Sequence, residues 1–157
     1  MKPRLYLETT IPSYLAARPS RDPITFGHQE ATRLWWNEHR HRYDFYVSEF
    51  VAMEIARGDA AAAAARTAFL DEIPRLSATP QVLQLARALI AEGLIPQKAG
   101  EDAAHIAVAT VHGMDFLLTW NCRHIHNVTT LRRIEQLCAK LGYACPVICS
   151  PDELLAT

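Results

Sequence analysis

The sequence predicts an α/β protein, a three-layer α/β/α sandwich around a central parallel sheet. Short apolar runs alternate with longer segments of helical periodicity along the whole chain. That order is typical of a parallel sheet whose strands are covered by helices on both faces. Half of the 157 residues are apolar and no shift in composition divides the chain, so we expect a single domain over residues 1–157.

Four segments are expected to be strands because they are short and apolar, with aromatic or β-branched residues in several of them. In chain order they are 4–8, 43–48, 115–119 and 146–149.

Eight segments are expected to be helices or helical turns. The first four are 12–16, which starts at a proline, 24–39, which is amphipathic, 49–57, and 60–71, which is alanine-rich and follows Asp59 as a candidate N-cap.

The other four are 80–92, which follows the cap-proline pair Thr79 and Pro80, 101–112, 128–141, which ends at a glycine, and the turn 151–155. Segment 101–112 is apolar on nearly all sides, which predicts a buried helix.

Bulk properties exclude several classes of protein. The net charge of −1 provides no global basic field for nucleic acid, and the four cysteines have no CxxC spacing, so we expect free thiols. No apolar run approaches the roughly 20 residues that span a bilayer, and Glu8 and Pro12 interrupt any signal-peptide core. We therefore expect a cytoplasmic protein with no membrane segment.

Three acidic residues lie in apolar surroundings, where carboxylates are rare unless they are paired or bind a metal. Glu8 follows the apolar run 5–7, Glu54 interrupts the apolar run 50–56, and Asp102 opens the apolar helix. Because ligands of parallel sheets bind beyond the carboxyl ends of the strands, we expect the three acids to gather at that edge around one divalent cation.

Electrostatics supports a shared cation. Two carboxylates about 4 Å apart repel by roughly 4 kcal/mol at an effective dielectric constant near 20. Mg²⁺ or Mn²⁺ would relieve that repulsion, and water bound to the ion would be a nucleophile near neutral pH. Glu49 and Glu101 are the rival acids, and we expect Glu49 to face solvent because it starts its helix.

Purely structural roles are the alternative for these acids. Asp102 could cap its helix, Glu54 could pair with Arg57, and Glu8 could pair with another basic residue.

Histidines near the same edge suggest two further possibilities. Cys122, His124 and His126 alternate and could bind zinc on an extended segment, although an ordinary loop is favoured because a fourth ligand is missing. His105 lies one turn from Asp102, where it could hydrogen-bond a metal-binding carboxylate or be a satisfied core residue.

Four segments in order resemble the PIN-domain family, most closely its VapC-like toxin ribonucleases. They are Tyr6–Thr10, Ser48–Gly58, Asp102–Ala107 and Leu117–Asn121, so the resemblance covers nearly the whole chain. It implies a PIN-like fold and a metal-dependent endoribonuclease, the toxin of a type II toxin–antitoxin pair. It further implies a homodimer, a cognate antitoxin and an RNA substrate.

The resemblance also implies roles for particular residues. Glu8, Glu54 and Asp102 would hold Mg²⁺ or Mn²⁺. Thr9 or Thr119 would orient a water or phosphate, and Asn121 would orient water or the metal.

Two positions depart from the family pattern, which usually has aspartate at Glu8 and often at Asn121. The extra methylene of Glu8 moves its carboxylate outward by about 1.5 Å, and Asn121 brings no charge. We therefore expect one tight metal site and a weaker second. These departures leave two alternative functions: a catalytically weakened PIN-fold binding module, or a DNA nuclease using the same chemistry.

Overall fold

A computed structural model describes residues 1–157 and contains one five-stranded sheet in the order β3-β2-β1-β4-β5. All four strand pairings are parallel, which confirms the predicted fold class. The strands are β1 (Arg4–Leu7), β2 (Asp44–Ser48), β3 (Arg75–Leu76), β4 (Phe116–Leu118) and β5 (Val147–Cys149).

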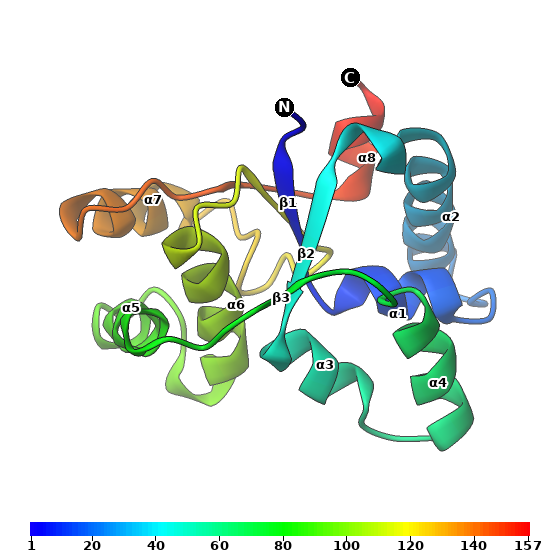
Figure 1. Ribbon diagram of the computed structural model, residues 1–157, viewed down its shortest axis with the longest axis horizontal. Helices are drawn as coiled ribbons and strands as arrows, with labels where there is room; N and C mark the ends of the chain where they lie inside the picture. The colour runs from blue at the N-terminus through cyan, green and yellow to red at the C-terminus, as the bar shows by residue number, and fades with distance from the viewer.

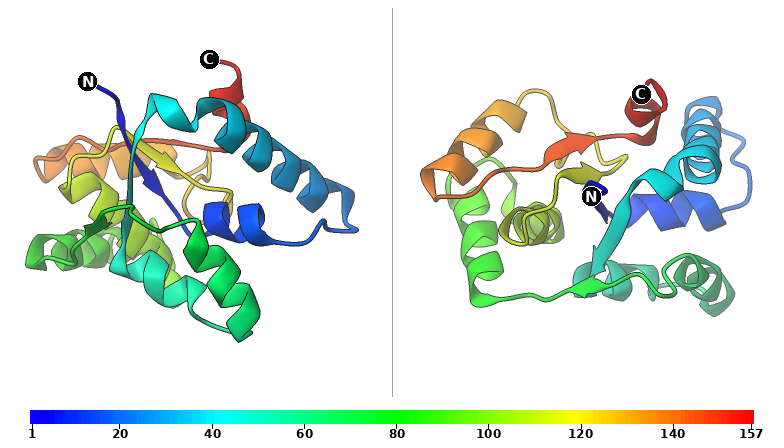
Figure 2. Two further views of the ribbon diagram at one scale, coloured as in Figure 1. Left: turned by 45° about the vertical axis from the view of Figure 1, so that its right-hand side comes forward. Right: turned by 45° about the horizontal axis from the view of Figure 1, so that its top comes forward.

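Helices cover both faces of this sheet, which gives the expected three layers (Figures 1 and 2). In Figure 1, α5, α6 and α7 lie to the left of the sheet, and α1, α2, α4 and α8 lie to its right. The helices are α1 (Thr10–Ala16), α2 (Pro23–His39), α3 (Glu49–Ile55), α4 (Ala60–Ala68), α5 (Pro80–Ala91), α6 (Gly100–Val111), α7 (Leu131–Lys140) and α8 (Pro151–Leu155). Two 3₁₀ turns, η1 (Arg40–Arg42) and η2 (Gln97–Ala99), precede β2 and α6.

The core forms where apolar strands meet apolar helix faces. Leu5, Tyr6 and Leu7 of β1 are at most 1% exposed, because β1 is the central strand and is covered on both faces. Helix α6 is buried from Ala103 to Thr110, as its sequence predicted. Trp35 of α2 is also fully buried.

Local capping explains where several helices begin and end. Asp59 and Thr79 accept hydrogen bonds from the first turns of α4 and α5, as predicted. Gly142 follows α7 with a φ of 90°, a left-handed conformation that favours glycine.

Several helix boundaries and one strand differ from the prediction, and α3 and α4 end earlier than expected, at Ile55 and Ala68. Helix α1 begins at Thr10, and α2 begins at Pro23 because Asp22 caps it. Helix α7 begins at Leu131 and not at 128, because the Asn127 carboxamide accepts hydrogen bonds from Thr129 and holds a turn there. The edge strand β3 was not predicted, since two residues carry no periodic signal.

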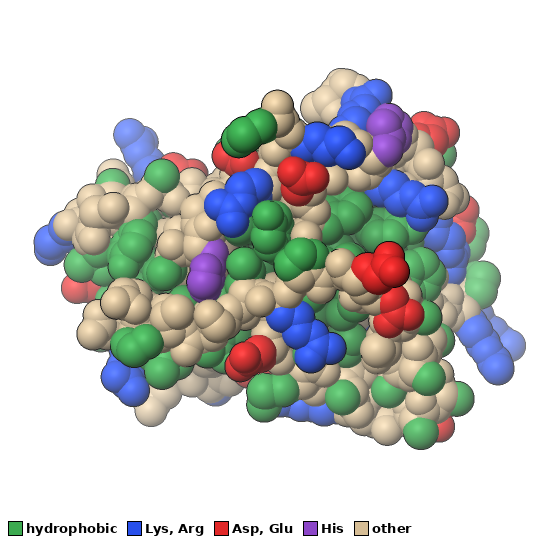
Figure 3. All heavy atoms as spheres, in the orientation of Figure 1, with side chains coloured by type: hydrophobic (Ala, Val, Ile, Leu, Met, Phe, Trp, Pro, Cys, Tyr) green, Lys and Arg blue, Asp and Glu red, His purple; other side chains and the backbone are tan.

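The face of the molecule in Figure 3 shows no concentrated basic field. Lys and Arg side chains are scattered over the face in Figure 3 and interspersed with acidic ones. None of the helices is both long enough and apolar enough to span a bilayer.

Candidate active site

Glu8 lies immediately beyond β1 and is 3% exposed. Its Oε1 accepts hydrogen bonds from the Thr10 N–H (3.1 Å), the Thr10 hydroxyl (2.6 Å) and the Thr119 hydroxyl (2.7 Å). Its Oε2 makes no hydrogen bond and is not among the buried polar atoms without a partner, so that oxygen reaches solvent. Glu8 forms no ion pair, which rules out its pairing with a basic residue.

Glu54 lies on α3, whose N-terminus is capped by Ser48 at the end of β2. Its Oε1 accepts a hydrogen bond from the Thr9 hydroxyl (2.9 Å) and is bonded to His105 Nε2. Arg57 forms its ion pair with Glu101 (2.5 Å). The alternative pairing of Glu54 with Arg57 is therefore wrong.

His105 joins β1, β2 and α3 from its position on α6. It is fully buried, and its Nδ1 lies 2.7 Å from the Tyr6 hydroxyl, which in turn lies 2.7 Å from Ser48 Oγ. A chain of polar contacts thus runs from Ser48 through Tyr6 and His105 to Glu54. This places His105 behind a predicted site carboxylate, which it supports through a hydrogen bond.

Sequence reasoning missed Tyr6 and Ser48 as members of this network. The available signal was a tyrosine in the middle of a buried strand, because a buried tyrosine hydroxyl needs a hydrogen-bond partner.

Burial, hydrogen bonds and nearby charges shift the pKa values of the titratable groups in this network. Burial alone would lower the pKa of His105, but the hydrogen bond to Glu54 and the charges of Glu8, Glu54 and Asp102 outweigh it and raise that pKa. Burial alone would raise the pKa of Glu54, but His105 and Thr9 lower it. Burial and the nearby carboxylates raise the pKa of Tyr6 well above 10.0. Because an ionised carboxylate only accepts, His105 Nε2 donates to Glu54. The Tyr6 hydroxyl lies within hydrogen-bond distance of both His105 Nδ1 and Ser48 Oγ and can donate to either of them.

Asp102 lies in the first turn of α6 and does not cap it, because the N-cap is Ala99 and no side chain makes a capping bond there. Burial raises the pKa of Asp102, and the Asn121 amide and the nearby imidazoles of His105 and His124 offset only part of that rise. Asp102 forms no ion pair. None of the three acids is therefore neutralised by an arginine or a lysine.

Asn121 follows β4 and organises the loop after it. Its Oδ1 accepts a hydrogen bond from the His124 N–H (3.0 Å), and its backbone carbonyl accepts from the N–H groups of Ile125 (3.3 Å) and His126 (2.8 Å). The side-chain amide of Asn121 lies beside Asp102 and lowers its pKa. The structure thus gives Asn121 a positioning role, and its carbonyl oxygen is already in use.

The two threonines support carboxylates, whereas a water or phosphate was expected to be their partner. Thr119 is fully buried, its hydroxyl donates to Glu8, and its N–H donates to the carbonyl of Cys149. Thr9 donates its hydroxyl to Glu54.

The donor set suits a hard divalent cation, but the site is not assembled around one point. Three carboxylates without basic partners match the oxygen ligands that Mg²⁺ and Mn²⁺ prefer. However, no three Asp, Glu, His or Cys side chains lie close enough together to hold a metal ion. In this arrangement Glu54 is hydrogen-bonded to His105, and the charges of Glu8 and Asp102 also act on that imidazole.

The zinc alternative in the loop after β4 is also unsupported. His126 Nε2 bonds to Glu153 (2.7 Å), Cys122 is exposed, and no metal-binding group is present. All four cysteines are free thiols, as expected.

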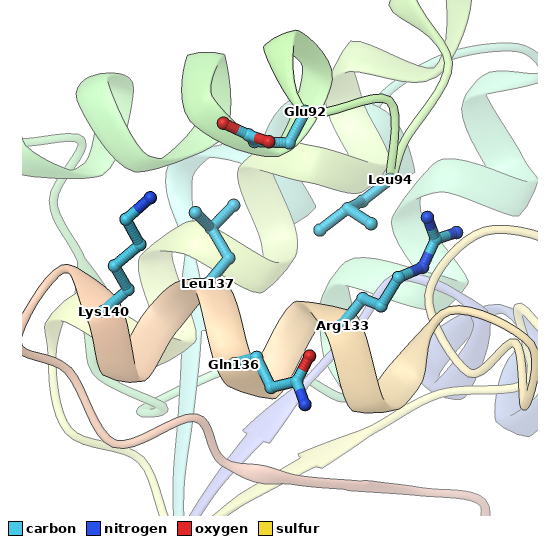
Figure 4. Close-up of a pocket in the computed structure, with 6 residues that line it drawn as sticks. All are labelled: Glu92, Leu94, Arg133, Gln136, Leu137 and Lys140. Carbon is cyan, nitrogen blue, oxygen red and sulfur yellow. The ribbon is translucent and has the colours of Figure 1, made fainter.

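Two pockets are relevant to the site. One of about 620 Å³ reaches Asp102. It is lined by Lys98, Ala99, Gly100, Glu101, Asp102, Arg123 and His124. A second pocket of about 240 Å³ lies near α5 and α7, with Arg133 and Lys140 on α7 and Glu92 after α5 (Figure 4). None of the predicted site residues lines this second pocket.

Comparisons with known proteins show a likeness in structure only. No family model matches the chain, and no curated protein matches it by sequence. The chain is similar to one in the crystal structure of VapBC2 from Rickettsia felis bound to a DNA fragment from their promoter, with a TM-score of 0.58 and 13% identity. That match covers 94% of this chain and 98% of the other.

A second similar chain is in tyrosyl-tRNA synthetase complexed with L-tyrosine from Archaeoglobus fulgidus. It has a TM-score of 0.45 and 16% identity, over 94% of this chain and 54% of that one. The likeness to VapBC2 shows the fold, in agreement with the PIN-like α/β/α architecture that the sequence predicted.

Proposed function

We propose that this protein is a metal-dependent endoribonuclease of the PIN fold and the toxin of a toxin–antitoxin pair. One observation carries the proposal. Three carboxylates from separate segments, Glu8, Glu54 and Asp102, lie around His105 at the carboxyl edge of a parallel sheet, and no arginine or lysine pairs with them. The likeness in fold to a chain of VapBC2 supports the toxin class.

In this proposal Glu8, Glu54 and Asp102 would hold Mg²⁺ or Mn²⁺. When bound, such an ion would supply Lewis-acid stabilisation of a phosphodiester oxygen and a water molecule of lowered pKa. The chain's own groups prepare the carboxylates. Thr119 fixes one oxygen of Glu8 and leaves the other open, while His105 orients Glu54.

The same class implies the protein's partners. A cognate antitoxin would cover the active site, two copies of the chain would form a homodimer, and the substrate would be cytoplasmic RNA. The fold relative supports only the first of these, because that structure is of VapBC2 bound to a DNA fragment from its promoter.

Cleavage assays with two variants and one control test the proposal. Wild-type protein with Mn²⁺ should cut single-stranded RNA, and D102N and E54Q should each reduce the rate by at least about 100-fold, the scale of a lost catalytic acid–base group or metal ligand. E49Q is the matched control, because it removes an exposed acid from the same helix as Glu54. Equal activity of E54Q, D102N and E49Q, with all three folded, would refute the proposed site.

A second candidate is a binding module with weakened catalysis. It is favoured by the absence of a ready three-ligand metal group and by the hydrogen bond that occupies the Asn121 carbonyl oxygen. RNA binding without cleavage in Mn²⁺ would support it. Cleavage of single-stranded DNA in preference to RNA would instead support a DNA nuclease.

A further inference from the structure

The pocket beside Asp102 has a basic wall. Lys98 belongs to η2, and Arg123 lies in the loop after β4. Both side chains are exposed, form no ion pair and make no hydrogen bond within the protein. Of the two acids that line the pocket, Glu101 is paired with Arg57. The free charges in the pocket are therefore Asp102 and the two cations.

The protein orders the loop that carries Arg123 and His124. Asn121 accepts hydrogen bonds from three backbone N–H groups of this loop, and the Asn127 amide donates to the Arg123 carbonyl (2.8 Å). Ile125, which lies between Asn121 and Asn127 in the sequence, is fully buried and anchors the loop in the core. Arg123 therefore projects from a fixed backbone, which reduces the entropy lost when its guanidinium binds a ligand.

We propose that this pocket binds the phosphodiester backbone of single-stranded nucleic acid and leads it to the carboxylate site. The proposal rests on the proposed function for its substrate class. Lys98 would act as a point charge, and the Arg123 guanidinium would bind phosphate oxygens with two donors. The volume of about 620 Å³ leaves room for a phosphate and its sugar beside Asp102.

An acidic antitoxin segment is the competing occupant, and the structure favours the nucleic acid. The pocket shares Asp102 with the carboxylate site, so a strand bound along this wall would lie next to that carboxylate. Its lining contains one hydrophobic residue, whereas protein interfaces have an apolar core.

Counterion release gives the expected magnitude. Each phosphate contact to a single strand contributes about −0.7 to the slope of log K against log salt. Loss of both contacts in the K98Q/R123Q double variant should therefore make the slope less negative by about 1.4. At 0.1 M salt this corresponds to an affinity about 25-fold weaker.

The test measures binding of a short labelled RNA by fluorescence anisotropy, with Mn²⁺ present and in the E54Q background, which keeps the RNA whole. The matched control is R133Q/K140Q, which removes the same charge from the pocket in Figure 4. We expect weaker binding and a reduced salt slope for K98Q/R123Q alone. DNA of the same sequence should lose affinity by the same factor, because the pocket reads phosphate.

Several outcomes would overturn the proposal. They are unchanged affinity, an equal loss in the control, a loss confined to RNA, or no measurable binding by the parent protein. Unchanged affinity would leave the pocket to an acidic protein partner. Failure of the proposed function is distinguishable, because wild-type protein would then bind RNA through Lys98 and Arg123 without cutting it.

Discussion

Replacing Thr119 by valine should destabilise the protein through Glu8, although the side chain keeps its shape. The Thr119 hydroxyl donates to the Glu8 carboxylate (2.7 Å) and accepts from the Asn121 N–H (2.9 Å), and the residue is fully buried. Valine can do neither. Loss of a hydrogen bond to a charged group costs about 1.5–3 kcal/mol, and loss of a neutral one costs about 1 kcal/mol.

The free energy of unfolding should therefore fall by about 2.5–4 kcal/mol in T119V. For a chain of this length, a loss of about 3 kcal/mol lowers Tm by about 6–12 °C. Urea unfolding followed by circular dichroism, in a buffer with EDTA, measures the first quantity directly. T129V is the control, because the Thr129 hydroxyl donates to an exposed neutral amide, and its loss should cost about 0.5 kcal/mol or less.

A double-mutant cycle with E8Q isolates the carboxylate's share. Since the Thr119 bond is stronger to a charged acceptor, T119V should cost about 1 kcal/mol less in the E8Q background. A cost of T119V no greater than that of T129V, or additivity with E8Q, would show that the hydroxyl does not hold the Glu8 carboxylate.

Three further measurements test the surrounding structure. The pKa of His105 is raised above 6.5, so its contribution to stability is fully present below pH 6.5 and is lost as the pH rises through the raised value. The pKa of Glu54 is lowered below 4.5, so its contribution is present above pH 4.5 and is lost as the pH falls through the lowered value. Urea titrations in EDTA should thus show the largest contribution of Glu54 and His105 to the free energy of unfolding between pH 4.5 and 6.5. The H105Q variant should flatten this dependence on pH. An unchanged dependence in H105Q would contradict the interaction of His105 with Glu54. Burial raises the pKa of the Cys149 thiol to about 12, whereas Cys122 is exposed. In native protein at about pH 8, iodoacetamide should therefore alkylate Cys122 long before Cys149. The reverse order would contradict the packing of β5. N121D should destabilise the metal-free protein, because it places a second carboxylate beside Asp102. Millimolar Mn²⁺ should raise the free energy of unfolding of N121D by about 2.7 kcal/mol if the ion is at about 100 times its Kd. No gain in stability would argue against a cation at this edge.

Most of the fold followed from local signals in the sequence. Strands β1, β2, β4 and β5 were predictable because each is a short apolar run, and burial on both faces requires such runs. Strand β3 was not, because its two residues pair with β2 only after the chain has folded.

The site was predictable only in part. Glu8, Glu54 and Asp102 could be predicted because a charged residue among apolar ones can be recognised from the sequence alone. The contact of His105 with Tyr6 was not, because it joins residues 99 positions apart. The expectation for Asn121 was incomplete for the same kind of reason. Its amide serves the backbone of the loop after β4, which depends on a conformation that no spacing reveals.

The sheet register explains why distant polar residues meet at this edge. Tyr6 pairs with Tyr46, Leu7 with Leu118, and Leu118 with Cys149. By this register Val47 is level with Leu7, and the residues one step further along the four strands are polar and at most 5% exposed: Ser48, Glu8, Thr119 and Ser150.

Each member of this row is the last residue of a strand or the first residue after one. Each makes a hydrogen bond with the segment that follows or with a neighbour in the row. Ser48 accepts from the first turn of α3, Ser150 forms a capping box with Glu153, and Thr119 donates sideways to Glu8. Glu8 is the only acid in the row, so the neutral members can fix a carboxylate without neutralising it. A shift of β2 by one residue would instead place Val47 or Glu49 level with Glu8. The position of the candidate active site is therefore a consequence of the same pairing that builds the core.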